Sequence, residues 1–206
     1  MGQEGLVTWL GSAIGFVMSL ILGLGTAAVV AAMFLAVAQS TASGEDEIHH
    51  WPTLQFTDWI GEVLFVVNSV ALSGLPGFLI GMLVGLLFQS STITGICCGV
   101  TIYAGFPFFF FSTTESNSPF AFVSKTAVES LRYSWSRWRS FYIRSFAMGA
   151  IPFLMFLLTN TDSILLNAFV AAVVMLALTI YARLVGRLIW CCAEDEAERI
   201  NAQSAD

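Results

Sequence analysis

The chain has 206 residues, of which 57% are hydrophobic and only 11% are charged, with a mean hydropathy of +0.80 and a net charge of −6 at pH 7. Soluble domains carry about 25% charged residues, so this chain has too little charge to cover a water-facing surface. The composition excludes a soluble globular domain, a disordered chain, a nucleic-acid-binding protein and a disulfide-rich secreted domain. It indicates an all-α, polytopic integral membrane protein.

Stretches almost free of charge define the predicted spans, since about 20 apolar residues are needed to cross the hydrocarbon core. The first stretch contains no turn signal and predicts one long helix. The second is divided by the polar run Gln89–Thr92 and the third by Thr159–Asp162, because such polar clusters mark loops. The resulting five spans are 8–38, 59–88, 93–111, 141–158 and 163–190. Four spans are the alternative, in which 141–158 lies in the membrane interface.

The orientation follows from the eight Lys and Arg residues, all of which lie after residue 124. Cytoplasmic segments are enriched in these residues, which places the connector before residue 141 and the end of the last helix in the cytoplasm. Two cytoplasmic regions need an even number of crossings between them, which favours five spans. We therefore expect a cell membrane protein, in an inner or plasma membrane, with its N-terminus outside and its C-terminus cytoplasmic. The acidic segment 193–206 is expected to be a flexible tail.

The connector has the pattern of an amphipathic helix over about 123–140. Apolar residues recur at intervals of three and four, as on one helical face: Val128, Leu131, Trp135, Trp138 and Tyr142. The segment Thr126–Glu129 has the form of a capping box that would start the helix. We expect the helix to lie in the cytoplasmic interface, where aromatic rings reach headgroup depth and arginines meet anionic lipid phosphate.

The predicted lipid-interface residues are Arg132, Trp135, Arg137, Trp138, Arg139 and Arg144. Topological anchoring by the positive-inside rule is their preferred role. Docking of a partner or sensing of lipid is the alternative.

Small residues recur at every fourth position in two of the predicted spans. The first row is Gly11, Gly15, Ser19 and Gly23, and the second is Gly77, Gly81 and Gly85. A spacing of four keeps such residues on one helical face, where their small side chains let another helix approach closely. Packing within the chain is the expectation for these rows. Association with a second chain, as a homo- or hetero-oligomer, is the alternative.

Pro76 predicts a kink or break in the second span, because proline removes a backbone donor and clashes with the preceding turn. We interpret it as the point where an interfacial segment turns into the bilayer. The alternative is a broken helix that exposes backbone groups to a substrate, as in many transporters. Pro152 predicts a second kink, which neighbouring helices would absorb.

Residue types that carry catalysis or bind metals are few and poorly spaced. His49 and His50 are adjacent, and no further histidine stands at metal-ligand spacing. The cysteines form the adjacent pairs Cys97–Cys98 and Cys191–Cys192 rather than the C-x-x-C of zinc or redox sites. The sequence has no nucleophile elbow and no phosphate-binding glycine loop. We therefore expect no enzymatic activity, no cofactor and no metal.

The centres of the predicted spans contain no ionisable residue, which argues against a proton-coupled carrier or a channel for charged solutes. We expect a non-catalytic membrane scaffold or accessory subunit that contacts lipids and partner helices. The alternative is a permease or channel-forming subunit for an uncharged or lipid-like solute, which would use the Pro76 break and the polar turn Gln89–Thr94. Nucleic acid is not an expected partner.

Overall fold

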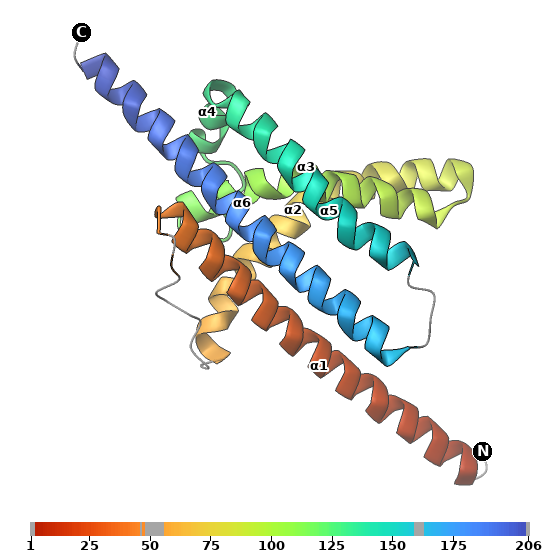
Figure 1. Cartoon of the computed structure of the whole chain (residues 1–206). Coiled ribbons are helices and arrows are strands. Elements are labelled where there is room, and N and C mark those ends of the chain that lie inside the picture. The colour runs from red at the N-terminus through yellow and green to blue at the C-terminus, as the bar shows by residue number, and fades with distance from the viewer. Residues whose placement is uncertain (1–2, 46, 48–55, 159–162, 205–206) are drawn as a thin grey trace.

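The computed structural model describes residues 3–45, 47, 56–158 and 163–204 (Figure 1). For residues 3–8, 10, 56–60 and 151–158 it describes the backbone alone. The helices are α1 (Gln3–Ala42), α2 (Phe56–Phe88), α3 (Ser91–Glu115), α4 (Lys125–Tyr133), α5 (Trp135–Leu158) and α6 (Ile164–Ser204). The described residues contain no β-strand, so the predicted all-α class is confirmed.

Among the described residues, four helices are long and apolar enough to cross a membrane: Gly11–Ala42, Gly61–Phe88, Ser91–Glu115 and Ile164–Ser204. These lengths and compositions fit a polytopic helical membrane protein. The predicted span 141–158 forms the greater part of α5, but its side chains from residue 151 onwards, Pro152 included, lie outside the described set. The choice between four and five spans stays a prediction.

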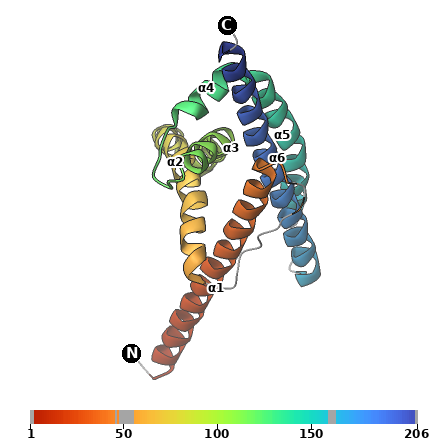
Figure 2. The same cartoon turned by 90° about the vertical axis from the view of Figure 1, so that its left-hand side faces the viewer.

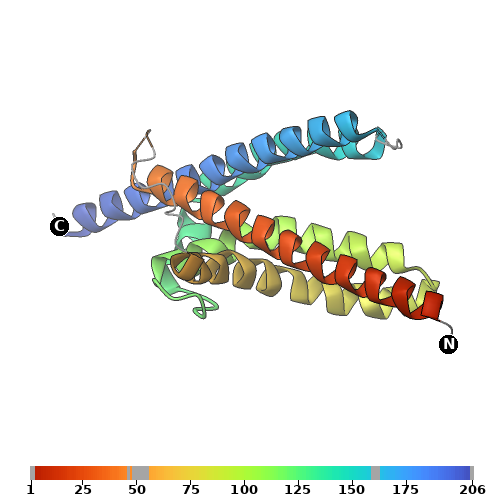
Figure 3. The same ribbon diagram turned by 90° about the horizontal axis from the view of Figure 1, so that it is seen from below.

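The helix α1 lies between two helical pairs (Figure 3). On one side it packs against α6, which packs in turn against α5; on the other side it packs against α2, which pairs with α3. The helices α1 and α6 run in the same direction, so the two ends of the chain lie at opposite ends of the molecule (Figure 1). The first part of α1 projects beyond the other helices (Figures 1 and 2).

The helices α2 and α3 form an antiparallel hairpin whose turn falls at the polar run that divides the second apolar stretch. Gln89 closes this turn with a φ of 50°, in the left-handed region. The helix α2 is not broken at Pro76 but bends along its length (Figure 2). Pro76 lacks a backbone donor, and the hydroxyls of Ser69 and Ser73 donate to carbonyls four residues earlier at 2.7 and 2.5 Å. Both features bend helices, so together they account for the shape of α2.

The core lies where the second half of α1 meets α3, α5 and α6. Phe34 of α1 packs edge-on against Phe106 and Phe110 of α3, with ring centroids 5.5 Å apart in each pair. Trp138 of α5 and Val185 of α6 are fully buried in the same cluster. Edge-to-face ring contacts favour a defined geometry, so this cluster fixes the four helices relative to one another.

The segment predicted as one interfacial helix over 123–140 is instead two helices with a turn at Ser134. The backbone there leaves the helical conformation, with φ of −104° and ψ of 32°. The turn lets α4 approach the end of α6 while α5 enters the bundle. Ser124, rather than the predicted Thr126, caps α4, and its hydroxyl accepts the N–H of Ala127 at 3.0 Å.

The C-terminal segment was expected to be a flexible tail from residue 193, but α6 continues as a helix to Ser204. Two causes explain the difference. The segment from residue 193 contains four Ala and three Glu, which favour helix. It also forms ion pairs with α4 and α5, which link positions far apart in the sequence.

Candidate functional site

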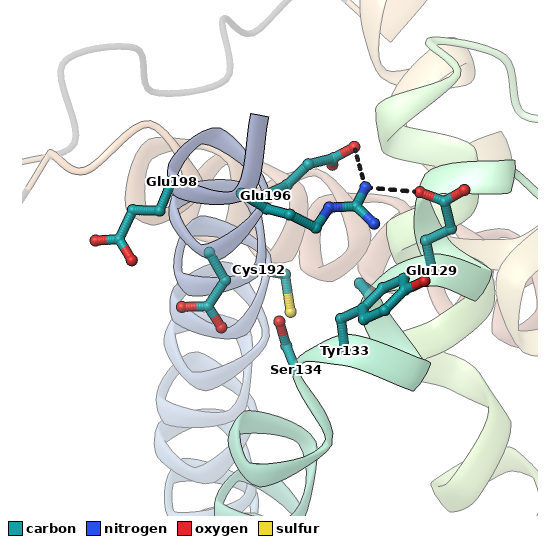
Figure 4. A pocket seen from close by; sticks show the side chains of 9 residues that line it. Glu129, Tyr133, Ser134, Cys192, Glu196 and Glu198 are labelled. Carbon is teal, nitrogen blue, oxygen red and sulfur yellow. Dashed lines mark hydrogen bonds and ion pairs between the residues drawn. The ribbon is translucent and has the colours of Figure 1, made fainter. Parts of the chain in front are cut away.

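The polar end of the molecule is built by α4, the start of α5 and the last turns of α6 (Figure 4). Arg199 of α6 donates to Glu129 of α4 at 3.0 Å and lies 4.0 Å from Glu196. Arg137 of α5 donates to Asp195 of α6 at 3.2 Å. These contacts connect three helices. They hold in place the last part of α6, residues 193–204, which is called the extension of α6.

The contact between α4 and α6 perturbs the protonation of its partners. The Arg199 guanidinium donates to Glu129 and thereby holds the pKa of that carboxyl below its ordinary value, while the pKa of Arg199 is raised by the same hydrogen bond. Arg199 also lies 4.6 Å from the ring centroid of Tyr133, a cation–π contact. Water reaches all of these groups, so salt screens each contact.

A pocket of about 250 Å³ lies between α4 and the end of α6 (Figure 4). In it the side chains of Cys192 and Ser134 face each other, whereas Glu198 points away (Figure 4). Burial raises the pKa of the Cys192 thiol to about 12, so the thiol stays protonated at neutral pH. Cys192 is therefore a packed core residue rather than an activated nucleophile. The pocket lies where α4 packs against α6, and its lining residues serve this packing.

Metal-ligand residue types do not gather elsewhere in the described chain. No group of three or more His, Cys, Asp or Glu side chains in that part of the protein is arranged to hold a metal ion. His49 and His50 lie outside the described residues. The Sγ of Cys98 lies 3.6 Å from the carbonyl oxygen of Gly74, so this thiol helps to join α3 to α2.

The small-residue row of α2 is filled by α3. A Cβ added to Gly77 would lie 2.5 Å from the carbonyl oxygen of Cys97, and one added to Gly81 would lie 2.8 Å from the Cα of Thr94. Gly85 continues the contact, since its Cβ would lie 2.7 Å from the hydroxyl of Thr94. At Gly77 and Gly81 these contacts are with backbone atoms at distances well below van der Waals contact, so the hairpin requires glycine at those two positions.

The small-residue row of α1 has different surroundings. A Cβ added to Gly11, Gly15 or Gly23 would meet no described atom of another element within 4 Å. Ser19, which completes the row, is exposed. Packing within the chain, which was the expectation for this row, is therefore not found. The face is open because this part of α1 extends past its neighbours (Figure 2).

The predicted lipid-interface residues are divided between the surface and the core. Trp138 does not lie at the interface but is fully buried, with ring centroids 6.4 Å from Phe108 and 6.2 Å from Tyr142. The turn at Ser134 separates the predicted apolar face into a part on α4, with Val128 and Leu131, and a part on α5, and α5 packs Trp138 into the core of the bundle. Trp135, the first residue of α5, is 57% exposed.

The five other predicted interface residues lie at the surface. Arg132 lies 5.6 Å from the ring centroid of Tyr133, and Arg137 has its ion pair with Asp195. Arg144 lines a groove with Arg187 of α6. Sequence reasoning did not join Arg144 to Arg187, because only the packing of α5 against α6 brings them together.

An apolar cavity of about 640 Å³ lies where α1, α2, α3, α5 and α6 meet. Its wall includes Phe34, Ile102 and Met148, and two of its polar side chains, Tyr103 and Ser145, have hydrogen-bond partners. The Tyr103 hydroxyl donates to the carbonyl oxygen of Tyr142 at 2.8 Å and lies 2.9 Å from the hydroxyl of Ser145. A space of this size and character suits an apolar molecule such as an acyl chain.

Comparisons of the chain with protein-family models, with curated proteins and with solved structures find no match.

Proposed function

We propose that this chain is a non-catalytic scaffold or accessory subunit of a cell membrane, in which α1 binds a helix of a partner chain. The observation that carries the proposal is the open row Gly11, Gly15, Ser19 and Gly23 on the projecting part of α1. Large apolar side chains surround this row, among them Phe16 and Leu22, so this part of the helix suits a lipid environment.

The hairpin of α2 and α3 provides a comparison within the same chain. There, the same spacing of small residues brings two helix backbones into contact at Gly77 and Gly81. Helices in lipid associate through close packing of this kind, because the hydrophobic effect does not drive them together. A row with the same spacing and no neighbour, as on α1, supports a partner helix from another chain.

We propose five spans, an outside N-terminus and a cytoplasmic C-terminus in an inner or plasma membrane. The parallel directions of α1 and α6 support an odd number of crossings (Figure 1). Arg137 and Arg144 lie near the start of α5, and Arg187 lies where α6 leaves the apolar bundle. Such a cluster at one end supports a cytoplasmic location and contact with anionic lipid headgroups.

Site-specific photocrosslinking in the native membrane tests the partner helix. A small diazirine amino acid at Ser19 lies in the open row, and one at Ile21 lies on the opposite face of α1. We expect Ser19 to give one discrete adduct with a protein chain and Ile21 to give lipid adducts. Lipid adducts alone at both positions would remove the support for a partner helix.

A permease or channel-forming subunit for an uncharged or lipid-like solute is the second candidate, and the apolar cavity favours it. Gly149 lines this cavity, and a Cβ there would meet no described atom within 4 Å. Gly149→Leu should therefore occupy part of the cavity, and Pro76→Ala should straighten α2. In a permease, both variants lose flux of an apolar solute in proteoliposomes. In a scaffold, both keep their protein partners and the parent shows no flux.

A further inference from the structure

A groove of about 350 Å³ lies between α5 and α6 near the polar end of the bundle. Arg137 and Arg144 stand seven residues apart on α5, close to two helical turns, and both line the groove. Arg187 lines it from α6, with Trp190 one turn further along. Two helices thus bring three guanidinium groups and one indole ring to a single site.

The positive charge of this groove is only partly neutralised by the chain. Arg137 is paired with Asp195 at 3.2 Å. Arg144 and Arg187 are exposed, and neither has an ion-pair partner among the described residues. Guanidinium groups on facing helices repel one another, so an anion between them would stabilise the pair of helices. Their planar donors suit phosphate oxygens in particular.

The floor of the groove is apolar. Phe141 of α5 and Leu188 of α6 are almost fully buried beneath the arginines, and Leu184 of α6 is half-buried beside them. Trp190 is 41% exposed at the rim. Tryptophan is enriched at headgroup depth, and both helices continue from here into their apolar parts. The groove therefore has arginines at its rim and apolar side chains at its floor. This arrangement matches a phospholipid, whose headgroup is charged and whose acyl chains are apolar.

We propose that the groove between α5 and α6 binds the phosphodiester headgroup of an anionic membrane phospholipid. Arg144 and Arg187 donate to the phosphate oxygens, and Ser140 supplies a hydroxyl at the same level. Leu184, which is half-buried, contacts the start of the acyl chains above the buried Phe141 and Leu188. Arg137 stays with Asp195 and holds the extension of α6 beside the site. This inference does not depend on a partner helix at α1, because it uses other helices.

Native mass spectrometry of the full chain, titrated with phosphatidylglycerol or phosphatidylcholine in a mild detergent, tests the site. The variant Arg144→Gln with Arg187→Gln removes two cations of the groove. The control Arg132→Gln with Arg139→Gln removes two exposed cations that do not line it. We expect the first pair to weaken phosphatidylglycerol binding about tenfold or more, and the control to change it less than about twofold.

Three results would overturn the proposal. Equal losses in both double variants would show that binding depends on overall surface charge. Equal binding of phosphatidylcholine by the parent would show that the groove does not select an anionic headgroup. Competition by inorganic phosphate at the same concentration as the lipid would show a site for the free anion.

A second measurement tests the site if the double variant Arg144→Gln with Arg187→Gln does not fold. Brominated phosphatidylglycerol quenches nearby indoles, and Trp190 is the indole that lines the groove. We expect the quenching by this lipid to fall in Trp190→Phe by more than it falls in Trp135→Phe, which removes an exposed indole outside the groove. Equal quenching losses in the two variants would contradict a bound lipid beside Trp190.

Discussion

Gly186 of α6 lies directly against Ala38 of α1, so that a Cβ at position 186 would overlap the Ala38 carbonyl oxygen and come within 2.7 Å of the Cβ of Thr41. This contact is one of those through which α6 packs against α1. Gly186→Ala should push the two helices apart and lower the free energy of unfolding by about 1–3 kcal/mol. Equilibrium unfolding in mixed micelles measures this loss.

The control for the contact between Gly186 and Ala38 is Gly25→Ala, because a Cβ at Gly25 would meet no described atom within 4 Å. Alanine favours helix over glycine, so this variant should be as stable as the parent or slightly more stable. A Gly186→Ala protein with parent stability would show that α1 and α6 separate without cost.

The hairpin of α2 and α3 allows a similar comparison within one pair of helices. A Cβ on Gly81 would lie 2.8 Å from the backbone of Thr94, whereas a Cβ on Gly95 would meet nothing within 4 Å. Gly81→Ala should therefore lower the unfolding free energy by about 1–3 kcal/mol, and Gly95→Ala should not. The same micelle unfolding assay checks both, and equal stabilities would contradict the tight hairpin.

The ion pair of Glu129 and Arg199 predicts a pH dependence of the α6 extension. The pKa of Glu129 lies below its ordinary value of 4.5, chiefly because Arg199 donates to its carboxylate. A depressed carboxyl pKa stabilises the folded contact above pH 4.5, and this stabilisation is lost as the pH falls through the folded-state pKa. Hydrogen exchange of residues 193–204, corrected for intrinsic rates, should become faster as the pH falls below 4.5.

Two variants separate this ion pair from the other carboxylates of the segment. Glu129→Gln should exchange faster than the parent already at pH 5 and depend less on pH. Glu198 points away from the pocket between α4 and α6 (Figure 4), so Glu198→Gln should show the same exchange rates and pH dependence as the parent. Parent-like exchange in Glu129→Gln would show that the pair does not hold the extension of α6.

The two adjacent C-terminal cysteines should differ in reactivity. Cys192 is buried and its pKa is raised to about 12 by desolvation, whereas Cys191 is only half-buried. Maleimide reacts with the thiolate, so a variant that keeps only Cys192 should be labelled at least about tenfold more slowly at pH 7.5 than one that keeps only Cys191. Both should react at the same rate in denaturant, and equal rates in the folded protein would contradict the burial of Cys192.

Local sequence features predicted the elements that depend on neighbouring residues. The polar run at Gln89 marks the turn between α2 and α3, because polar and turn-forming residues end an apolar helix wherever they occur. Pro76 marks a bent helix because the missing donor is a property of proline itself. The all-α class follows from composition, since a chain with so little charge must satisfy its backbone within helices in lipid.

Features that depend on distant contacts were not predicted. The turn at Ser134 and the helical end of α6 both depend on contacts such as Glu129 with Arg199, and no local pattern encodes such a pair. The groove that joins Arg144 to Arg187 and the apolar cavity arise only when the helices pack. The open row at Gly15 needed the structure as well, because the same spacing at Gly81 is filled.

The mass of the complex extracted from its native membrane in a mild polymer, with every chain identified, tests the central claim that α1 binds a partner helix. One variant, Gly15→Leu with Gly23→Leu, fills the open row. The other, Val17→Phe with Ile21→Phe, adds bulk to the opposite, exposed face of the same helix. The parent should carry a stoichiometric second chain, the first variant should run as a single 22.4 kDa chain, and the second should keep the partner. A parent that runs alone, or a first variant that retains the partner, would contradict the claim.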